Sequence, residues 1–132
     1  MKSLYVSIFL FFGVVAALWA NSIYIKQLVK NTNELFEEIP DDIYKVDNMT
    51  QKNQQKALDD IEKILQLWKR KKLYLCSILD HNMYRQFTGE IETAKAFFEA
   101  QEYPEFLSYI ISAKDSLLHI KQDEEIFLGN IL

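Results

Sequence analysis

The residues best suited to chemistry in this sequence are two histidines, each with a carboxylate close by in the chain. His81 directly follows Asp80, while His119 stands four residues from both Asp115 and Asp123. Positions four apart share a face of a helix, which suits metal binding or proton transfer. A catalytic zinc site usually takes three protein ligands with histidine prominent, and the chain has only 2 His. We therefore expect no metal site. The predicted roles are structural, with His81 in a turn and His119 near a helix C-terminus, where partial positive charge suits the dipole.

Cys76 is the single cysteine, so the chain has no intramolecular disulfide and no cysteine cluster for zinc. A reactive cysteine lies in an electropositive and partly exposed environment. Lys71 and Lys72 are near Cys76 in the sequence, but apolar residues surround it: Leu73, Leu75, Ile78 and Leu79. We expect Cys76 to be a buried small apolar side chain rather than a nucleophile.

The strongest charge feature is a run of four cations, namely Lys69, Arg70, Lys71 and Lys72. Such a run could bind anionic lipid headgroups, cell-wall phosphates or an acidic partner. Four successive helical positions point all round a helix, so solvated faces are the default interpretation. An acidic stretch earlier in the chain is a candidate to pair with the run, and it comprises Glu34, Glu37, Glu38, Asp41 and Asp42. Together with Asp80, His81 and His119, the four cations are the candidate interaction residues.

The composition excludes several classes of function. A formal net charge of -4 lacks the basic excess with which nucleic-acid binders neutralise phosphates, so we expect no nucleic-acid partner. The sequence has no glycine-rich phosphate loop, no nucleophile elbow and no zinc signature. We therefore expect no cofactor and no catalytic residues.

An uncharged apolar segment extends from Leu4 to Ala20 and continues weakly to Tyr24. A membrane-spanning helix needs roughly 20 mostly apolar residues to cross about 30 Å of hydrocarbon, and this segment meets that length. Aromatic residues near its ends, Tyr5 and Trp19, suit the headgroup zone. The segment therefore predicts an N-terminal transmembrane anchor.

A cleaved signal peptide is the alternative, because Lys2 gives a minimal positive region and Ala20 and Ser22 are small residues before a cut at Ile23. The apolar core exceeds the usual length of about 7–15 residues, and a helical pattern continues past the cut, so we favour a retained signal-anchor. Secretion after cleavage stays open as an alternative.

The orientation in the membrane depends on few charges. Lys2 lies on one side of the segment, and Lys26 and Lys30 lie on the other, so the positive-inside count is nearly tied. The short N-terminal tail favours a cytoplasmic N-terminus, with the C-terminal domain outside the cell membrane. Gly13 and Ala17 stand four apart, a spacing that lets two membrane helices approach closely, so a homo-oligomer through them is a further hypothesis.

The rest of the chain has helical periodicity and no sustained strand alternation. Pro40 ends the helix that continues the anchor, and Thr50 and Asp80 are candidate N-caps. Three apolar stripes follow, on a long helix from Leu58 to Leu79, on a second from Tyr84 to Phe98, and on a third from Phe106 to Leu117, with a short apolar coda from about Glu124. The fold class is therefore all-α, with a transmembrane helix and then an antiparallel bundle of about three to four helices. We expect an anchor at 1–25, a helical extension and polar linker at 26–49, and the bundle at 50–132.

Several motifs give the chain a family resemblance. They are the Leu58, Leu65 and Trp68 helix, the sequence Ile78-Leu79-Asp80-His81, the helix from Ile91 to Phe98, the sequence Leu117-Leu118-His119-Ile120, the acidic patch Asp123, Glu124 and Glu125, and the ending Leu128-Gly129-Asn130-Ile131-Leu132. With these motifs the chain resembles a bacterial family named domain of unknown function 4363, whose members are small proteins with one N-terminal membrane helix. The resemblance implies an anchored extracytoplasmic helical domain that associates with other membrane proteins, and it implies no activity.

These observations predict a membrane-anchored, extracytoplasmic helical interaction module, or an accessory subunit of a membrane assembly, with no catalytic activity. Its expected partners are the membrane, through the single N-terminal helix, and a membrane or envelope protein. The alternatives are a bundle that senses a ligand bound between its helices and a secreted helical protein.

Overall fold

A computed structural model describes residues 1–131, apart from the side chains of Leu128 and Ile131. Every element in this part of the chain is a helix, and none of its residues lies in a strand. The helices are α1 (Lys2–Glu37), α2 (Ile43–Asp47), α3 (Gln51–Lys69), α4 (Lys72–Ile78), α5 (His81–Glu99) and α6 (Tyr103–Ile131). The predicted all-α fold class is therefore confirmed.

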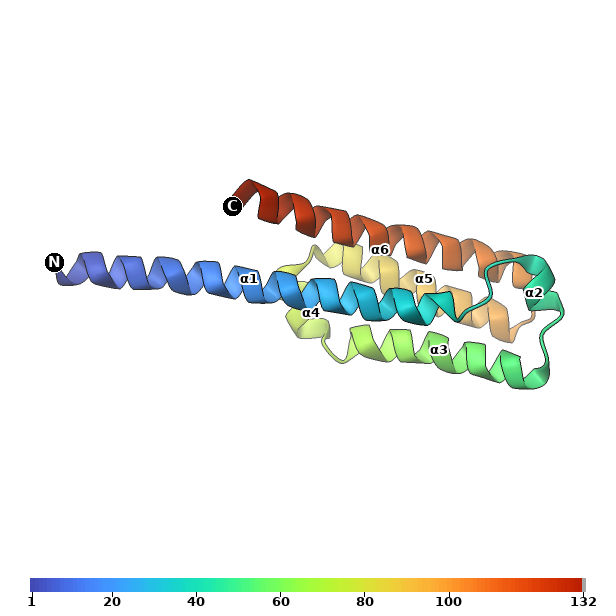
Figure 1. Cartoon of the computed structure of the whole chain (residues 1–132). Helices are drawn as coiled ribbons and strands as arrows, with labels where there is room; N and C mark the ends of the chain where they lie inside the picture. Colours follow the sequence, from blue (N-terminus) through green and yellow to red (C-terminus); the bar gives the residue numbers. More distant parts are fainter. Residues whose placement is uncertain (132) are drawn as a thin grey trace.

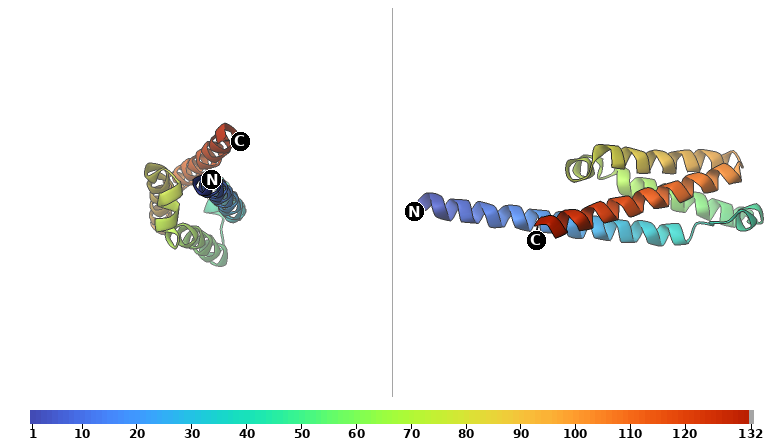
Figure 2. Two further views of the ribbon diagram at one scale, coloured as in Figure 1. Left: turned by 90° about the vertical axis from the view of Figure 1, so that its left-hand side faces the viewer. Right: turned by 90° about the horizontal axis from the view of Figure 1, so that it is seen from above.

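Four helices form an antiparallel bundle in which neighbours in space alternate in direction (Figure 1). The C-terminal half of α1 contacts α3 and α6, and α5 contacts both of these helices in turn. The short helix α4 lies at the end of the bundle nearest the N-terminus, and α2 lies at the opposite end (Figures 1 and 2). The first half of α1 projects beyond the other helices (Figure 2).

The helix α1 carries the apolar segment and the first helix of the bundle without a break. Its N-terminal half is exposed, and the window that is apolar and long enough to cross a membrane has no buried residue. The first buried position is Ser22, and Ile25, Leu28, Val29 and Phe36 follow in the core. The apolar half fits a membrane anchor or a signal sequence. Within the helical extension and polar linker predicted at 26–49, α1 continues to Glu37 and supplies core residues, and the short helix α2 lies in the part predicted as a linker.

Trp68 lies at the centre of the core and is 0% exposed. Its ring centroid lies 4.5 Å from that of Phe87 on α5. Its indole Nε1 donates a hydrogen bond of 3.0 Å to Oγ1 of Thr32 on α1, and this hydroxyl donates in turn to the carbonyl oxygen of Leu28 at 2.7 Å. A buried N–H needs an acceptor, so this bond fixes how α1 and α3 face each other.

Local sequence signals set several helix boundaries as expected. Thr50 caps α3, since its hydroxyl accepts from the backbone N–H of Asn53 at 3.2 Å. Asp80 caps α5, since its carboxylate accepts from the backbone N–H of Asn82 at 2.7 Å. The helix α1 ends shortly before Pro40, because proline cannot continue an α-helix.

The long helix predicted from Leu58 to Leu79 is wrong, because α3 ends at Lys69 and α4 begins at Lys72. The turn lets the chain cross the end of the bundle, so that Leu75 enters the core at 0% exposure while Leu73 remains exposed. The basic run therefore spans a turn instead of circling one helix. Cys76 is half-buried rather than buried, because α4 packs at the rim of the core.

The separate coda predicted after Glu124 is also wrong, because α6 continues without a break to Ile131. His119 consequently lies in mid-helix and not near a helix C-terminus. Ile126 and Phe127 are exposed in the last turns of α6. Leu132 and the side chains of Leu128 and Ile131, which belong to the chain ending quoted for the family resemblance, lie outside the described residues.

The hydrogen bond between Trp68 and Thr32 can be tested by Thr32→Val, which keeps the shape and removes the acceptor. The indole N–H is then buried without a partner, so we expect a loss of about 1–3 kcal/mol in the free energy of unfolding. Urea unfolding of the detergent-solubilised protein, followed by circular dichroism, measures this loss. Thr88→Val is the matched control, because the buried Thr88 hydroxyl bonds only to carbonyls of its own helix. Its removal should reduce the free energy of unfolding by a smaller amount. Equal losses for the two variants would contradict the assigned role of the bond.

Candidate functional site

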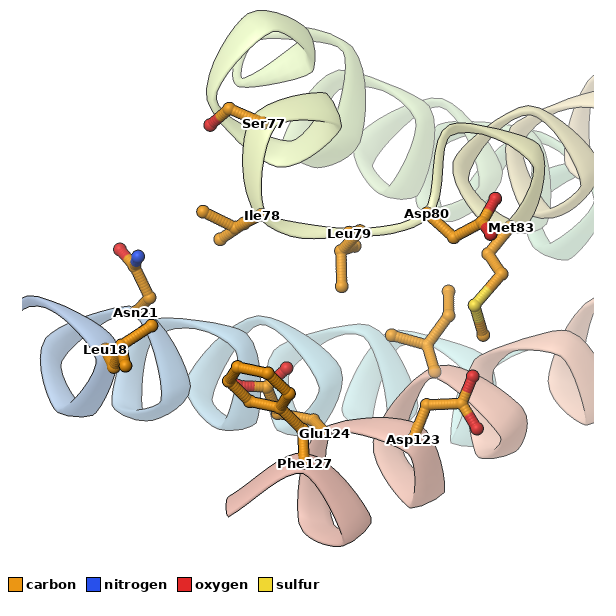
Figure 3. Close-up of a pocket in the computed structure, with 11 residues that line it drawn as sticks. Leu18, Asn21, Ser77, Ile78, Leu79, Asp80, Met83, Asp123, Glu124 and Phe127 are labelled. Atoms are coloured by element: carbon orange, nitrogen blue, oxygen red, sulfur yellow. The ribbon is translucent and has the colours of Figure 1, made fainter. Parts of the chain in front are cut away.

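A groove lies where α1 leaves the bundle, between α1, the corner that joins α4 to α5, and the C-terminal part of α6 (Figure 3). Its volume is about 390 Å³. The groove is named the junction groove below. Its apolar lining comprises Leu18, Ile78, Leu79, Met83, Ile120 and Phe127, and its polar lining comprises Asn21, Ser77, Asp80, Asp123 and Glu124.

Contacts between α4 and α1 hold one wall of the junction groove in place. The hydroxyl of Tyr74 donates a hydrogen bond to the side-chain oxygen of Asn21. The ring of Tyr74 also packs edge-on against Tyr24, with 5.1 Å between the ring centroids. Leu79 then adopts an extended conformation, and Asp80 begins α5. The helix α4 is thus attached to α1 directly after the exposed apolar segment.

The polar lining of the junction groove is acidic. Asp80 comes from the α4–α5 corner, and Asp123 and Glu124 come from α6 (Figure 3). No lysine or arginine is among the described residues that line it. Burial raises the pKa of the Glu124 carboxyl, and Lys26 and the Ser22 hydroxyl offset part of this rise. The groove therefore combines an apolar lining with negative charge, which suits an apolar group that carries a cation.

The basic run lies at the same end of the bundle but on the side formed by α3 and α5. Lys69 forms an ion pair with Glu92 of α5. Lys72 and His81 line a shallow depression on this side, together with Arg85. Arg70 lies in a different depression, along α3 beside Leu67. The structure brings Lys72 and His81 together, a convergence that the sequence analysis did not identify.

The candidate pairing between the basic run and the acidic stretch does not form among the described residues. Glu38 pairs with Lys56 at 2.6 Å, and Asp41 pairs with Lys45 at 3.3 Å. Both acidic residues follow α1 at the end of the bundle near α2, whereas the basic run adjoins α4 at the opposite end (Figure 1). Separation along the bundle axis prevents the two stretches from meeting.

The two histidines lie apart and have different neighbours. His81 Nδ1 lies 3.4 Å from the sulfur of Cys76, across the α4–α5 corner. His119 Nε2 lies 3.4 Å from Asp115 on the exposed face of α6. Among the residues that the structure describes, no group of three or more histidine, cysteine or acidic side chains could hold a metal ion. The contact between Cys76 and His81 was missed because it depends on the turn between the two helices.

Nucleophilic catalysis by Cys76 would need more than a nearby histidine. A catalytic cysteine is activated by a base that a third group orients, beside donors that stabilise an oxyanion. Within residues 1–131, no carboxylate hydrogen-bonds to His81. The pair has the geometry of a weak hydrogen bond that joins α4 to α5.

The small residues Gly13 and Ala17 lie on the exposed half of α1, and no heavy atom would lie within 4 Å of a Cβ added at Gly13. This surface is open to a second helix. Pairing of two copies through it remains a prediction.

Comparison with known protein families matches residues 23–131 to the family described as "Domain of unknown function (DUF4363)". The match begins just after the apolar segment and covers all helices of the bundle. It confirms the resemblance inferred from the motifs. No curated protein and no solved structure matches the chain.

The partly buried carboxyl of Glu124 gives a prediction for pH dependence. The pKa of this carboxyl is raised in the folded state, so the charged carboxylate destabilises the fold. This destabilisation is present above the folded-state pKa and is absent below the ordinary pKa of a glutamate, where the group is protonated in both states. Glu124→Gln should therefore raise the melting temperature at pH 7, and the difference from wild type should vanish near pH 4. Thermal unfolding of the detergent-solubilised protein at both pH values measures this, with Glu125→Gln as the exposed control. A lower melting temperature for Glu124→Gln at pH 7 would contradict the burial of this charge.

Proposed function

The chain belongs to the DUF4363 family, a domain of unknown function, and we propose that it is a non-enzymatic interaction module held at the membrane by α1. In this proposal the bundle stands at the end of the anchor and receives a partner membrane protein in the junction groove. The protein would then act as an accessory subunit of a membrane assembly.

The observation that carries the proposal is the position and chemistry of the junction groove. Leu18 belongs to the exposed apolar half of α1, and it lines the groove together with residues of the bundle. A segment that occupies the groove would therefore lie close to the membrane surface. The carboxylates of Asp80, Asp123 and Glu124 favour a segment with a lysine or arginine beside an apolar side chain. A basic juxtamembrane helix of another membrane protein has this chemistry.

Retention of the anchor is part of the proposal. Asn21 is hydrogen-bonded to Tyr74, and Ser22 is buried. A cut before Ile23 would remove both residues, and Leu18 with them, so the groove would lose one wall. This supports an anchor over a cleaved signal peptide. We further propose a cytoplasmic N-terminus and a bundle outside the cell membrane.

The arrangement of polar groups supports a binding role over catalysis. The groups in the junction groove are carboxylates, an amide and a serine hydroxyl, without a histidine or a cation. The pair of Cys76 and His81 lies outside the groove lining. General acid–base or nucleophilic chemistry needs convergent groups with matched proton affinities.

Ligand sensing is a second candidate, because the volume of about 390 Å³ is within the range of small-molecule sites, roughly 300–1,000 Å³. The same lining would favour a cationic amphiphile. A saturable rise in melting temperature with such a ligand would support this candidate, since a ligand that binds only the folded state stabilises it.

Photo-crosslinking in native membranes tests the proposed function. A benzophenone amino acid at Met83, in the junction groove, should give one discrete adduct with a membrane protein. The same amino acid at Tyr44, which is 75% exposed on α2 at the far end of the bundle, is the control for nonspecific crosslinking. It should give no such adduct. The charge reversal Asp123→Lys should abolish the adduct at Met83.

Either of two outcomes would contradict the proposal that the junction groove binds a partner membrane protein. One is identical adducts from Met83 and Tyr44. The other is the absence of any adduct at Met83 while the full-length protein is present in the membrane. This second result would favour ligand sensing as the function.

A further inference from the structure

The contacts of α4 place this helix at the height of the lipid headgroups. The uncharged apolar segment ends at Ala20, and α4 is attached to α1 at Asn21 and Tyr24. A helix rises about 1.5 Å per residue, so these contacts lie within roughly 6 Å of the end of the segment along the axis. The headgroup zone adds about 5–7 Å on each side of the hydrocarbon core. The helix α4 and the turn before it therefore lie in this zone when α1 spans the membrane.

Cations converge at this height on the α3–α5 side of the bundle. Lys72, His81 and Arg85 line a shallow groove, which is named the basic groove below, with a volume of about 620 Å³. Lys69 and Glu92 also line it and neutralise each other in an ion pair. In the described part of the chain, neither Lys72 nor Arg85 forms an ion pair.

An exposed apolar side chain accompanies the cations. Leu73 directly follows Lys72 and is 89% exposed, although its neighbours Tyr74 and Leu75 pack against α1 and the core. A large apolar side chain beside free cations at headgroup height is the combination that interfacial membrane contacts use.

We propose that the basic groove binds the phosphate of anionic phospholipid headgroups through Lys72, Arg85 and His81, while Leu73 enters the membrane surface. This inference rests on the retained anchor of the proposed function, but not on the junction groove or its partner. The group bound is a phosphodiester monoanion. Its source is the lipid, because the anchor holds the basic groove at the lipid surface.

The distribution of acidic groups agrees with this assignment. The carboxylates Asp80, Asp123 and Glu124 line the junction groove on the α1–α6 side, and the two grooves share no lining residue. The membrane-proximal end is therefore acidic on one side and basic on the other. Lipid contact on the basic side leaves the acidic side accessible to a basic partner.

The strength of the contact follows from the number of cations. A lysine or arginine close to an anionic membrane surface contributes about a fivefold gain in association. Removing both Lys72 and Arg85 should therefore weaken the contact about 25-fold. His81 adds a ring nitrogen that can donate a hydrogen bond to the phosphate.

Fluorescence quenching in lipid nanodiscs tests the proposal with the full-length protein. A Cys76→Ser background carries a single fluorophore at Asn82→Cys, an exposed position next to His81, and the quencher is a spin label on the lipid headgroup. Quenching should be strong in nanodiscs that contain phosphatidylglycerol, weaker in purely phosphatidylcholine nanodiscs, and reduced by 0.5 M salt. A fluorophore at Tyr44→Cys, at the far end of the bundle, should not be quenched.

Charge variants identify the groups responsible. Lys72→Gln with Arg85→Gln should remove the preference for phosphatidylglycerol. Lys45→Gln with Lys52→Gln, which changes the net charge equally at the far end, should preserve it. Equal quenching in both lipids, or equal behaviour of the two double variants, would overturn the proposal.

Two further outcomes separate the sources of failure. Loss of quenching on addition of 10 mM inorganic phosphate at constant ionic strength would assign the basic groove to soluble phosphate and overturn the lipid assignment. Full-length protein that elutes apart from the nanodiscs in size exclusion would instead refute the membrane anchor, on which both proposals depend. Loss of the crosslink at Met83 alone would refute only the proposed partner protein.

Discussion

Continuity of α1 is the constraint on which the other features of this protein depend. One helix carries the exposed apolar segment and then contributes Ile25, Leu28 and Phe36 to the core, so anchor and bundle form one rigid body. Trp68 secures this arrangement through its hydrogen bond to Thr32, because a slip of α1 along α3 would leave the buried indole N–H without an acceptor. A flexible linker would let the bundle rotate freely above a membrane. A continuous helix instead fixes which residues would lie at the surface of a membrane that α1 spans.

If α1 spans a membrane, the end of the bundle nearest the membrane has two different sides. The turn between α3 and α4 and the contact of Tyr74 with α1 place the basic groove on one side. The long α6 returns along α1 and places carboxylates and Phe127 in the junction groove on the other. In the two proposals both grooves serve recognition, with a phosphate bound on one side and an apolar cation on the other.

The sequence predicted most of the fold, because helix periodicity and capping are local. Thr50, Asp80 and Pro40 mark boundaries that the structure confirms. The boundary at Lys69–Lys72 was missed, since the apolar stripe from Leu58 to Leu79 has helical spacing on both sides of this turn. The break predicted at about Glu124 does not exist, since the sequence has no Gly or Pro between Phe106 and Leu128 to end the helix. The candidate site was predicted only in part. Lys72 and His81 were singled out, but their convergence with Arg85, the contact of Cys76 with His81 and the whole junction groove depend on tertiary packing, for which one sequence carries no local signal.

The central claim is that α1 stays whole and holds the bundle at the membrane. The intact mass of the protein, measured both in salt-washed membranes and in the soluble fractions of its native host, is the most direct test. We expect a single membrane-bound species that retains residues 1–22. A product that begins at Ile23 and is released from the membrane would contradict it, because the junction groove would then lack Leu18 and Asn21 and the basic groove would no longer be held at the lipid surface.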